Sequence, residues 1–85
     1  MKEFSYVITD AQGVHARPAG MLVKFAKELK STVTISKDGK TADATRLIAV
    51  MGLGIKQGQE ITVTVEGENE EADAAAVLEF FKGNL

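Results

Sequence analysis

The sequence predicts a small α+β domain in which a four-stranded sheet has three helices covering one of its faces. Three segments alternate apolar and polar residues, which is typical of strands with one buried face. An Asp38-Gly39 pair predicts a two-residue hairpin turn that leads into a further short strand. Two longer segments repeat apolar residues at helical spacing. The expected element order is β-α-β-β-α-β-α, and we expect residues 1–85 to form a single domain.

The four strands are expected at residues 4–9, 32–36, 40–44 and 60–66. The first strand contains aromatic and β-branched residues. In the fourth strand, three apolar β-branched residues alternate with two threonines. Such a sheet has an apolar face that needs a cover, and helices on one side supply it.

The three helices are expected at residues 16–29, at residues 46–51 and between Asn69 and Gly83. Pro18 is favoured in the first turn of a helix, because an N–H there has no intrahelical partner. The short middle helix should stop at the glycines that follow it. Asn69 can cap the last helix, acidic residues suit its positive N-terminal end, and Gly83 can close it. The apolar stripe of the first helix consists of Ala19, Leu22, Val23, Ala26 and Leu29.

The composition excludes several classes of protein. Without cysteine the chain forms no disulfide and no thiolate metal site, and a single histidine does not support a multi-histidine metal cluster. We therefore expect no metal and no cofactor. No apolar run approaches the roughly 20 residues of a membrane span, and the alternating start MKEFSYVITD is unlike a signal peptide. We expect a cytoplasmic protein that does not insert into a membrane.

Charge is unevenly distributed along this chain of net charge −2. Residues 11–27 contain three basic side chains and no acidic one, whereas residues 60–85 contain seven acidic residues and one lysine. This pattern predicts one electropositive end that suits a small anion or an acidic partner. The basic patch is too small for duplex nucleic acid, and we expect no nucleic-acid partner.

The segment GVHARPAG, residues 13–20, contains the only histidine and the only proline of the chain. With Pro18 in the first turn of a helix, His15 falls at or near the N-cap, and Ala16 and Arg17 supply free backbone N–H groups. A helix N-terminus binds anions through such groups and through its positive dipole end. The guanidinium of Arg17 also matches phosphate oxygens. The segment therefore predicts a phosphate site beside a histidine.

A histidine at this place suits a carrier of phosphoryl groups. A neutral imidazole leaves one ring nitrogen free to attack, and the positive helix end disfavours the charged ring. Taken alone, a histidine before a helix is more often a surface or capping residue, and Arg17 could be a solvated residue of the first turn. A cation at the positive end of a helix is unfavourable unless an anion binds nearby, which favours the functional interpretation.

Several apolar residues near this segment lie off the core stripe. Met21 and Phe25 follow one and two turns beyond the cap, and the short helix is more apolar than a surface helix needs. Each of these residues, taken singly, is more often a core residue. Those that stay exposed would form an apolar docking ring around His15, and methionine-rich surfaces adapt to several partners. The candidates in the short helix are Leu47, Ile48 and Met51.

The sequence GVHARPAG, then GKTADATRL after a D-G hairpin, then MGLGIKQGQEITVTVEG, resembles the histidine-containing phosphocarrier (HPr) family of the bacterial sugar phosphotransferase system. The resemblance runs without gaps over about residues 6–78. It implies an open-faced β-sandwich, in which three helices cover one face of a four-stranded antiparallel sheet. It also implies that His15 accepts a phosphoryl group from phosphorylated enzyme I, itself charged by phosphoenolpyruvate, and passes it to the A domains of sugar-specific enzyme II permeases.

The resemblance further implies the roles of individual residues. Arg17 would neutralise the phosphate, and Ala16 and Arg17 would donate their backbone amides to it. Such a protein is an intermediate in the reactions of other enzymes and turns nothing over alone. We expect a monomer, because the edge strands are short and the docking face must stay free. The implied partner-docking surface consists of Gly20, Met21, Lys24, Leu47, Ile48 and Met51.

One position departs from the family pattern. Many Gram-positive members carry a serine, the target of a regulatory kinase, directly before the short helix, where this sequence has Arg46. Arginine cannot be esterified by that kinase, which argues against serine-linked control through this protein. Thr45 points about 100° away at a helix start and does not take over the role. We interpret Arg46 as positive charge beside the phosphohistidine that strengthens docking to acidic partners.

Three other functions fit parts of the sequence. A hydrolase of the acylphosphatase type also binds phosphate through arginine and amides, but its glycine-rich phosphate loop is missing here. A sheet-surface RNA-binding module needs paired aromatic residues on the central strands, and the charge balance here is acidic. A purely regulatory relative is disfavoured, because His15 is present and the regulatory serine is absent.

Overall fold

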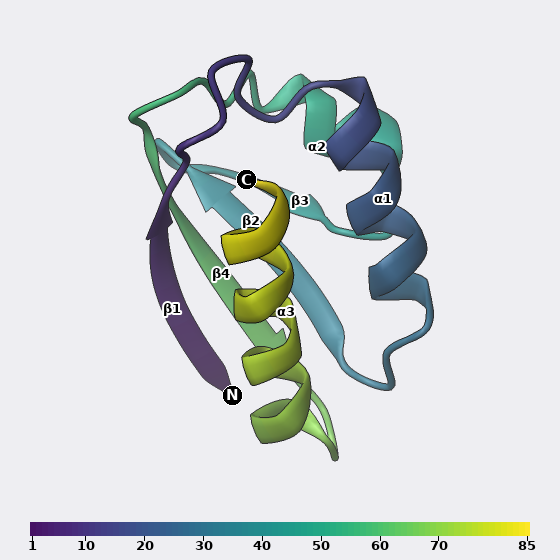
Figure 1. Ribbon diagram of the computed structural model, residues 1–85. Coiled ribbons are helices and arrows are strands. Elements are labelled where there is room, and N and C mark those ends of the chain that lie inside the picture. The colour runs from purple at the N-terminus through teal and green to yellow at the C-terminus, as the bar shows by residue number, and fades with distance from the viewer.

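The computed structural model describes residues 1–85, and its elements follow the order expected from the sequence (Figure 1). The strands are β1 (Lys2–Val7), β2 (Thr32–Lys37), β3 (Lys40–Asp43) and β4 (Glu60–Glu66). The helices are α1 (Ala16–Lys27), α2 (Leu47–Gly52) and α3 (Glu70–Asn84).

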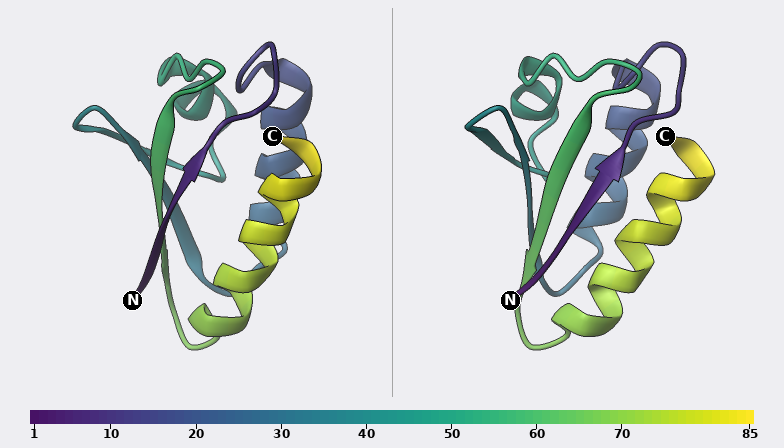
Figure 2. Two further views of the ribbon diagram at one scale, coloured as in Figure 1. Left: turned by 60° about the vertical axis from the view of Figure 1, so that its left-hand side comes forward. Right: turned by 90° about the vertical axis from the view of Figure 1, so that its left-hand side faces the viewer.

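The four strands form one antiparallel sheet in the order β1-β4-β2-β3. In the central pair Val33 lies opposite Val65 and Ile35 lies opposite Val63, and these four side chains are buried. Because side chains alternate along a strand, this register puts the apolar residues on one face and the threonines on the other. Figure 2 shows α1 and α3 on the same side of the sheet, with the short α2 near one end of it. The predicted open-faced β-sandwich is confirmed.

Aromatic side chains join the last helix to the first strand. Phe81 of α3 is the largest fully buried side chain. The rings of Tyr6 and Phe4 from β1 pack against it, with centroids 5.5 Å and 6.1 Å away. The Tyr6 hydroxyl also donates a hydrogen bond to the Phe81 carbonyl oxygen at 3.1 Å. These contacts hold the C-terminal end of α3 near the loop that follows β1.

The start of the chain differs from the sequence-based expectation. Strand β1 spans Lys2–Val7 instead of residues 4–9, so Ile8 and Thr9 lie beyond its end. The N–H groups of Thr9 and Asp10 both donate to the Leu85 carbonyl oxygen, at 2.6 Å and 2.9 Å. Ile8 still exchanges backbone bonds with Gln59 and Gly58 at 3.0 Å and 2.8 Å, so the contact with Leu85 replaces strand pairing only from Thr9 onward, and it draws the β1–α1 loop to the end of α3.

The last helix begins where the sequence predicts, but its capping bond and its C-terminal limit differ from the prediction. Asn69 does occupy the N-cap of α3, but its side chain makes no capping bond to the helix and instead donates to Asp73 Oδ1 at 3.1 Å. Gly83 does not close the helix, because it lies outside the left-handed region and α3 continues to Asn84. The first helix is also shorter than predicted and ends at Lys27.

The turn predictions are confirmed. Asp38 and Gly39 have φ angles of 50° and 81°, which matches a tight two-residue hairpin between β2 and β3. Gly54 follows α2 with a φ of 63°, as expected for a glycine that ends a helix.

Candidate functional site

His15 is the N-cap residue of α1, as the position of Pro18 predicted. Its backbone is extended, and its carbonyl oxygen accepts the N–H of Ala19 at 3.0 Å. Its side chain makes no capping bond, so the first-turn N–H groups of Ala16 and Arg17 have no side-chain partner there. The imidazole is 35% exposed and therefore accessible to a partner protein.

The loop before His15 is held tightly against the segment that follows α2. The N–H of Val14 donates to the Ile55 carbonyl oxygen at 3.1 Å. Gly13 has a φ of 67°, and a Cβ at this position would lie 2.3 Å from the Ile55 carbonyl oxygen and 2.7 Å from the Cα of Lys56. Only glycine fits both the backbone angle and the space. This contact sets the position of His15 from outside its own helix.

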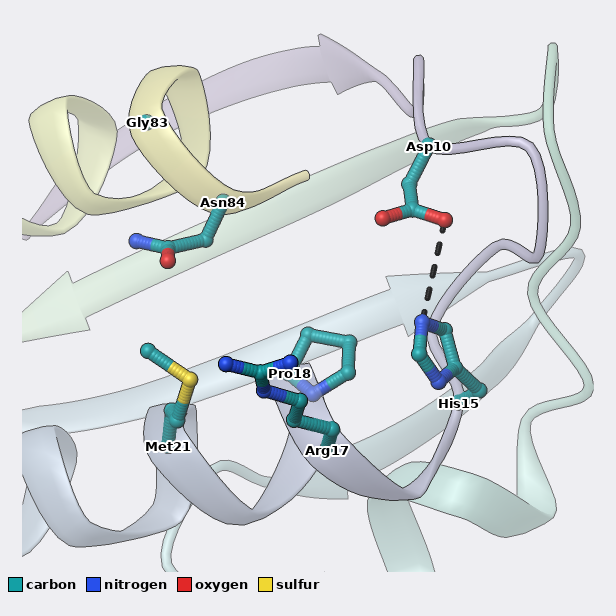
Figure 3. Close-up of a pocket in the computed structure, with 7 residues that line it drawn as sticks. All are labelled: Asp10, His15, Arg17, Pro18, Met21, Gly83 and Asn84. Carbon is teal, nitrogen blue, oxygen red and sulfur yellow. Dashed lines mark ion pairs between the residues drawn. The ribbon is translucent and has the colours of Figure 1, made fainter.

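His15 lines an open pocket of about 260 Å³ at the N-terminal end of α1 (Figure 3). The β1–α1 loop and the end of α3 border the same pocket, opposite the first turns of α1. The lining residues are Asp10, His15, Arg17, Pro18, Met21, Gly83 and Asn84. The structure thus brings together two regions of the chain that no local sequence pattern connects.

Asp10 is a pocket residue that no sequence motif singled out. Its Oδ1 atom lies 3.7 Å from His15 Nε2, and Figure 3 shows the carboxylate pointing at the ring. The same oxygen accepts the N–H of Gln12 at 2.8 Å. An aspartate in a turn commonly makes such a local bond, so the sequence held no separate indication that Asp10 faces His15.

Gly83 and Asn84 are the other pocket residues that sequence reasoning missed. They belong to the last turns of α3, and the Asn84 side chain donates to the Phe80 carbonyl oxygen at 2.9 Å. Their place in the pocket depends on how α3 packs on the sheet, which the sequence pattern does not specify.

The electrostatics of the pocket favour an anion beside the ring. Arg17 is exposed and forms no ion pair within the chain, so its charge is available to a ligand. No acidic residue lies in the first turn of α1. Asp10 is the one acidic side chain among the lining residues. The pocket can therefore place a guanidinium and free amides next to a nucleophilic nitrogen, which is the chemistry of a phosphorylated histidine.

The predicted docking residues lie on α1 and α2, two helices that pack side by side (Figure 1). Ile48 is 81% exposed, and Met21, Leu47 and Met51 are each 38–43% exposed. An exposed group of large apolar side chains is typical of an interaction surface. Lys24 is also exposed, and Gly20 is half-buried. The structure thus assembles the surface, and the docking role remains a prediction.

Phe25 is not part of this surface, although its position off the core stripe allowed it. Its ring stacks on that of Phe80 of α3, with centroids 5.1 Å apart and an interplanar angle of 13°. Both rings pack against the hydrophobic core. Phe25 therefore joins α1 to α3 instead of facing a partner.

The start of α2 is organised around Asp43. This carboxylate accepts the Thr45 hydroxyl at 2.7 Å and the Thr45 N–H at 2.9 Å. These two bonds, and to a smaller extent the charge of Arg46, hold the pKa of Asp43 below its ordinary value. Arg46 itself is the exposed N-cap residue of α2 and forms no ion pair within the chain.

The end of α2 is held by a side chain from the sheet. Lys37 of β2 donates to the carbonyl oxygens of Leu53 and Gly54 at 3.2 Å and 3.1 Å. A cation is favourable at the negative C-terminal end of a helix. The apolar surface on α2 therefore sits on a helix fixed at both ends.

No group of three histidine, aspartate or glutamate side chains is arranged to hold a metal ion. None of the three helices has the length and the apolar character that a membrane span needs.

Solved structures share this fold at substantial sequence identity. HPr from Thermoanaerobacter tengcongensis matches with a TM-score of 0.92 and 32% identity, over 99% of this chain and 94% of that one. HPr from Bacillus anthracis matches with a TM-score of 0.88 and 31% identity, over 94% of this chain and 95% of that one. A dimer of the Thermoanaerobacter protein matches with a TM-score of 0.76 and 32% identity, over 98% and 95%.

The sequence itself matches the family described as "PTS HPr component phosphorylation site" over residues 2–83. It is 39% identical over 71 residues to the phosphocarrier protein HPr of Lysinibacillus sphaericus, and the match covers 84% of this chain and 81% of that protein. The resemblance seen in GVHARPAG and the segments that follow is therefore confirmed. The chain belongs to the HPr family, the phosphocarrier component of the phosphotransferase system.

Proposed function

We propose that His15 carries a phosphoryl group from phosphorylated enzyme I to the A domains of sugar-specific enzyme II permeases. The chain is then a carrier and not an enzyme. One observation supports this above the others: the single imidazole of the chain lies half-exposed at the N-cap of α1, in one pocket with Arg17 and beside the uncapped amides of Ala16 and Arg17. Membership of the HPr family supports the same role.

Nδ1 of His15 is the ring nitrogen that the geometry favours as acceptor. Nε2 faces the Asp10 carboxylate at 3.7 Å, which favours a proton on Nε2 and leaves the lone pair on Nδ1. That lone pair forms the P–N bond while the bond from phosphorus to the donor's leaving atom breaks, and the electron pair of that bond stays with the donor. The amides at the start of α1 and the Arg17 guanidinium then stabilise the phosphoryl oxygens.

Replacing Arg17 should slow phosphorylation strongly. We expect Arg17→Ala to lower the initial rate of phosphoryl acceptance about 100-fold, because one preorganised donor to the transferring group typically contributes that much. Arg17→Lys should fall in between, since a lysine lacks the bidentate fork. The measurement is the rate of radiolabel transfer at fixed enzyme I. Lys27→Ala, a loss of exposed positive charge later on α1, is the matched control and should transfer at the wild-type rate.

Arg46 should contribute to docking through charge. It is exposed beside Leu47 and Ile48, and no carboxylate of this chain forms an ion pair with it. We expect Arg46→Ser to raise the dissociation constant for enzyme I about threefold at low salt, which is the typical effect of losing one exposed charge contact. The difference in affinity between the variant and the wild type should shrink at 0.5 M salt, because salt screens exposed charges. Calorimetric titration measures both. Lys40→Ser, an exposed position at the start of β3, controls for net charge, and equal affinities for the two variants would remove Arg46 from the docking surface.

A cytoplasmic location and a monomeric state are part of the same proposal. The carrier must present the face formed by α1 and α2 to one partner after another, so this face cannot stay covered. Sedimentation equilibrium at micromolar concentration tests the oligomeric state, and a stable dimer that buries Ile48 would contradict it.

The carrier function is tested by intact mass after incubation with phosphoenolpyruvate and a bacterial enzyme I. We expect one phosphate per chain that is lost in mild acid, as phosphohistidine is, and that transfers to an added enzyme II A domain. Absence of phosphate, with the same enzyme I active on another carrier, would contradict the proposal. The chain would then be better described as a binding module in which His15 only starts a helix.

A further inference from the structure

We propose that Asp10 is a positioning residue for this phosphoryl transfer. Its carboxylate holds the proton on Nε2 of His15 and stabilises the positive charge that the ring gains when Nδ1 is phosphorylated. The inference rests on the proposed carrier function and adds to it a residue outside the segment 13–20.

The distance and direction of the contact support this role. Asp10 Oδ1 lies 3.7 Å from His15 Nε2, which is an ion-pair distance and longer than a hydrogen bond (Figure 3). Contacts in unloaded sites are often long and tighten in the reacting complex. The two side chains are 31% and 35% exposed, so water screens the pair only in part.

Asp10 is held in place by bonds that do not involve His15. Its N–H donates to the main-chain oxygen of Leu85, and its own carbonyl oxygen accepts the N–H of Gly13, both at 2.9 Å. Its Oδ1 accepts the N–H of Gln12 at 2.8 Å, and a carboxylate oxygen has a second lone pair available for the ring. The carboxylate is therefore fixed at the imidazole before any phosphate arrives.

Asp10 offsets the positive charges around the ring. Arg17 from α1 lines the same pocket and opposes a positive charge on the imidazole. Lys82 from α3 borders a neighbouring hollow together with Asp10, and its ammonium lies 4.0 Å from Glu79. Asp10 is the one acidic residue that lines the pocket, so among the lining side chains only its charge favours the ring cation.

The chemistry needs such a partner in both directions. Attack by the Nδ1 lone pair on phosphorus leaves the ring with a phosphoryl group on Nδ1 and a proton on Nε2, and hence with one positive charge. During onward transfer a nucleophilic atom of the acceptor protein forms a bond to phosphorus while the P–N bond breaks. The electron pair of the P–N bond returns to Nδ1, and the ring becomes neutral again with the same proton on Nε2. Asp10 neither gives nor takes a proton; it keeps the ring in the form that both accepts and releases phosphate.

The test compares Asp10→Asn with the wild type and with Asp38→Asn. Asparagine keeps the acceptor for the Gln12 N–H but removes the charge. Asp38 is an exposed hairpin residue, and its left-handed backbone also tolerates asparagine, so it matches the change in charge. The readouts are the ³¹P resonance of the phosphorylated protein as a function of pH and the rates of phosphate acceptance and release.

We expect the pH at which the phosphorylated ring loses its Nε2 proton to fall by about half a unit in Asp10→Asn, and both rates at pH 7.5 to fall about threefold, the effect of a partly exposed charge pair. Asp38→Asn should match the wild type in both measurements. A merely structural role of Asp10 would lower stability without moving the ³¹P titration.

The outcomes separate this inference from the function on which it rests. If the wild type takes up phosphate and Asp10→Asn matches it in titration and rates, Asp10 has no such role and the carrier function stands. If the wild type takes up no phosphate from an active enzyme I, the carrier function is wrong, and the role of Asp10 in it falls as well.

Discussion

His15→Ala is expected to acquire no phosphate from phosphoenolpyruvate and enzyme I, which is a complete loss of carrier activity. His15 is the only imidazole of the chain, and no other residue lining the pocket offers a nucleophilic ring nitrogen. The first turn of α1 would still present its amides and Arg17, but these groups bind phosphate without forming a bond to it. Intact mass measured before and after mild acid treatment detects the difference.

The His15→Ala substitution should have little effect on the stability of the fold. The His15 side chain is 35% exposed and makes no capping bond, so we expect the free energy of unfolding to change by less than about 0.5 kcal/mol. Urea unfolding of His15→Ala is therefore the control that separates lost chemistry from lost structure. An acid-stable phosphate on the folded variant would place the acceptor on a serine or threonine and contradict the proposal.

Gly13→Ala should destabilise the protein by about 3 kcal/mol, since a left-handed backbone disfavours alanine and the new methyl group overlaps neighbouring backbone. The Cβ would meet the Ile55 carbonyl oxygen at 2.3 Å and the Cα of Lys56 at 2.7 Å, and neither is the end of a flexible side chain. The loop must therefore move away from Ile55, and this movement breaks the hydrogen bond from the Val14 N–H to the Ile55 carbonyl oxygen. Urea denaturation measures the loss.

Gly39→Ala separates the two causes of that loss. Gly39 has a similar φ of 81°, but a Cβ there would meet nothing within 4 Å. We expect Gly39→Ala to lower the free energy of unfolding by only the cost of a left-handed backbone for alanine, about 1–2 kcal/mol. The phosphorylation rate should fall for Gly13→Ala, which displaces His15, and stay unchanged for Gly39→Ala, which is far from the pocket. Equal effects of the two variants on stability would mean that the Ile55 contact is not tight.

Much of the fold was predictable because it depends on local patterns. The alternation in residues 60–66 and the Asp38-Gly39 turn identify strands and a hairpin, since a strand repeats every two residues and this turn needs left-handed angles. Element ends were less predictable. β1 ends at Val7, and although Ile8 still bonds to Gln59 and Gly58, the N–H of Thr9 bonds to the main-chain oxygen of Leu85, a contact between opposite ends of the sequence.

The helix limits and one surface residue show the same dependence on packing. Gly83 is a common helix-ending residue, yet α3 continues through it while Phe81 fills the core against β1. Phe25 lies off the apolar stripe of α1 and was a candidate for the docking ring. Phe80 of α3 covers it instead, which only the relative placement of the two helices could decide.

By itself the sequence determined that His15 starts a helix, with Arg17 and two free amides beside it, because Pro18 and helix geometry decide this within four residues. The tertiary structure alone decided what faces the other side of the ring. Asp10 reaches Nε2 because the β1–α1 loop is bonded to the end of α3, and Asn84 lines the pocket for the same reason. Contacts of this kind depend on how the sheet and helices pack over the whole chain, so no local pattern of residues specifies them.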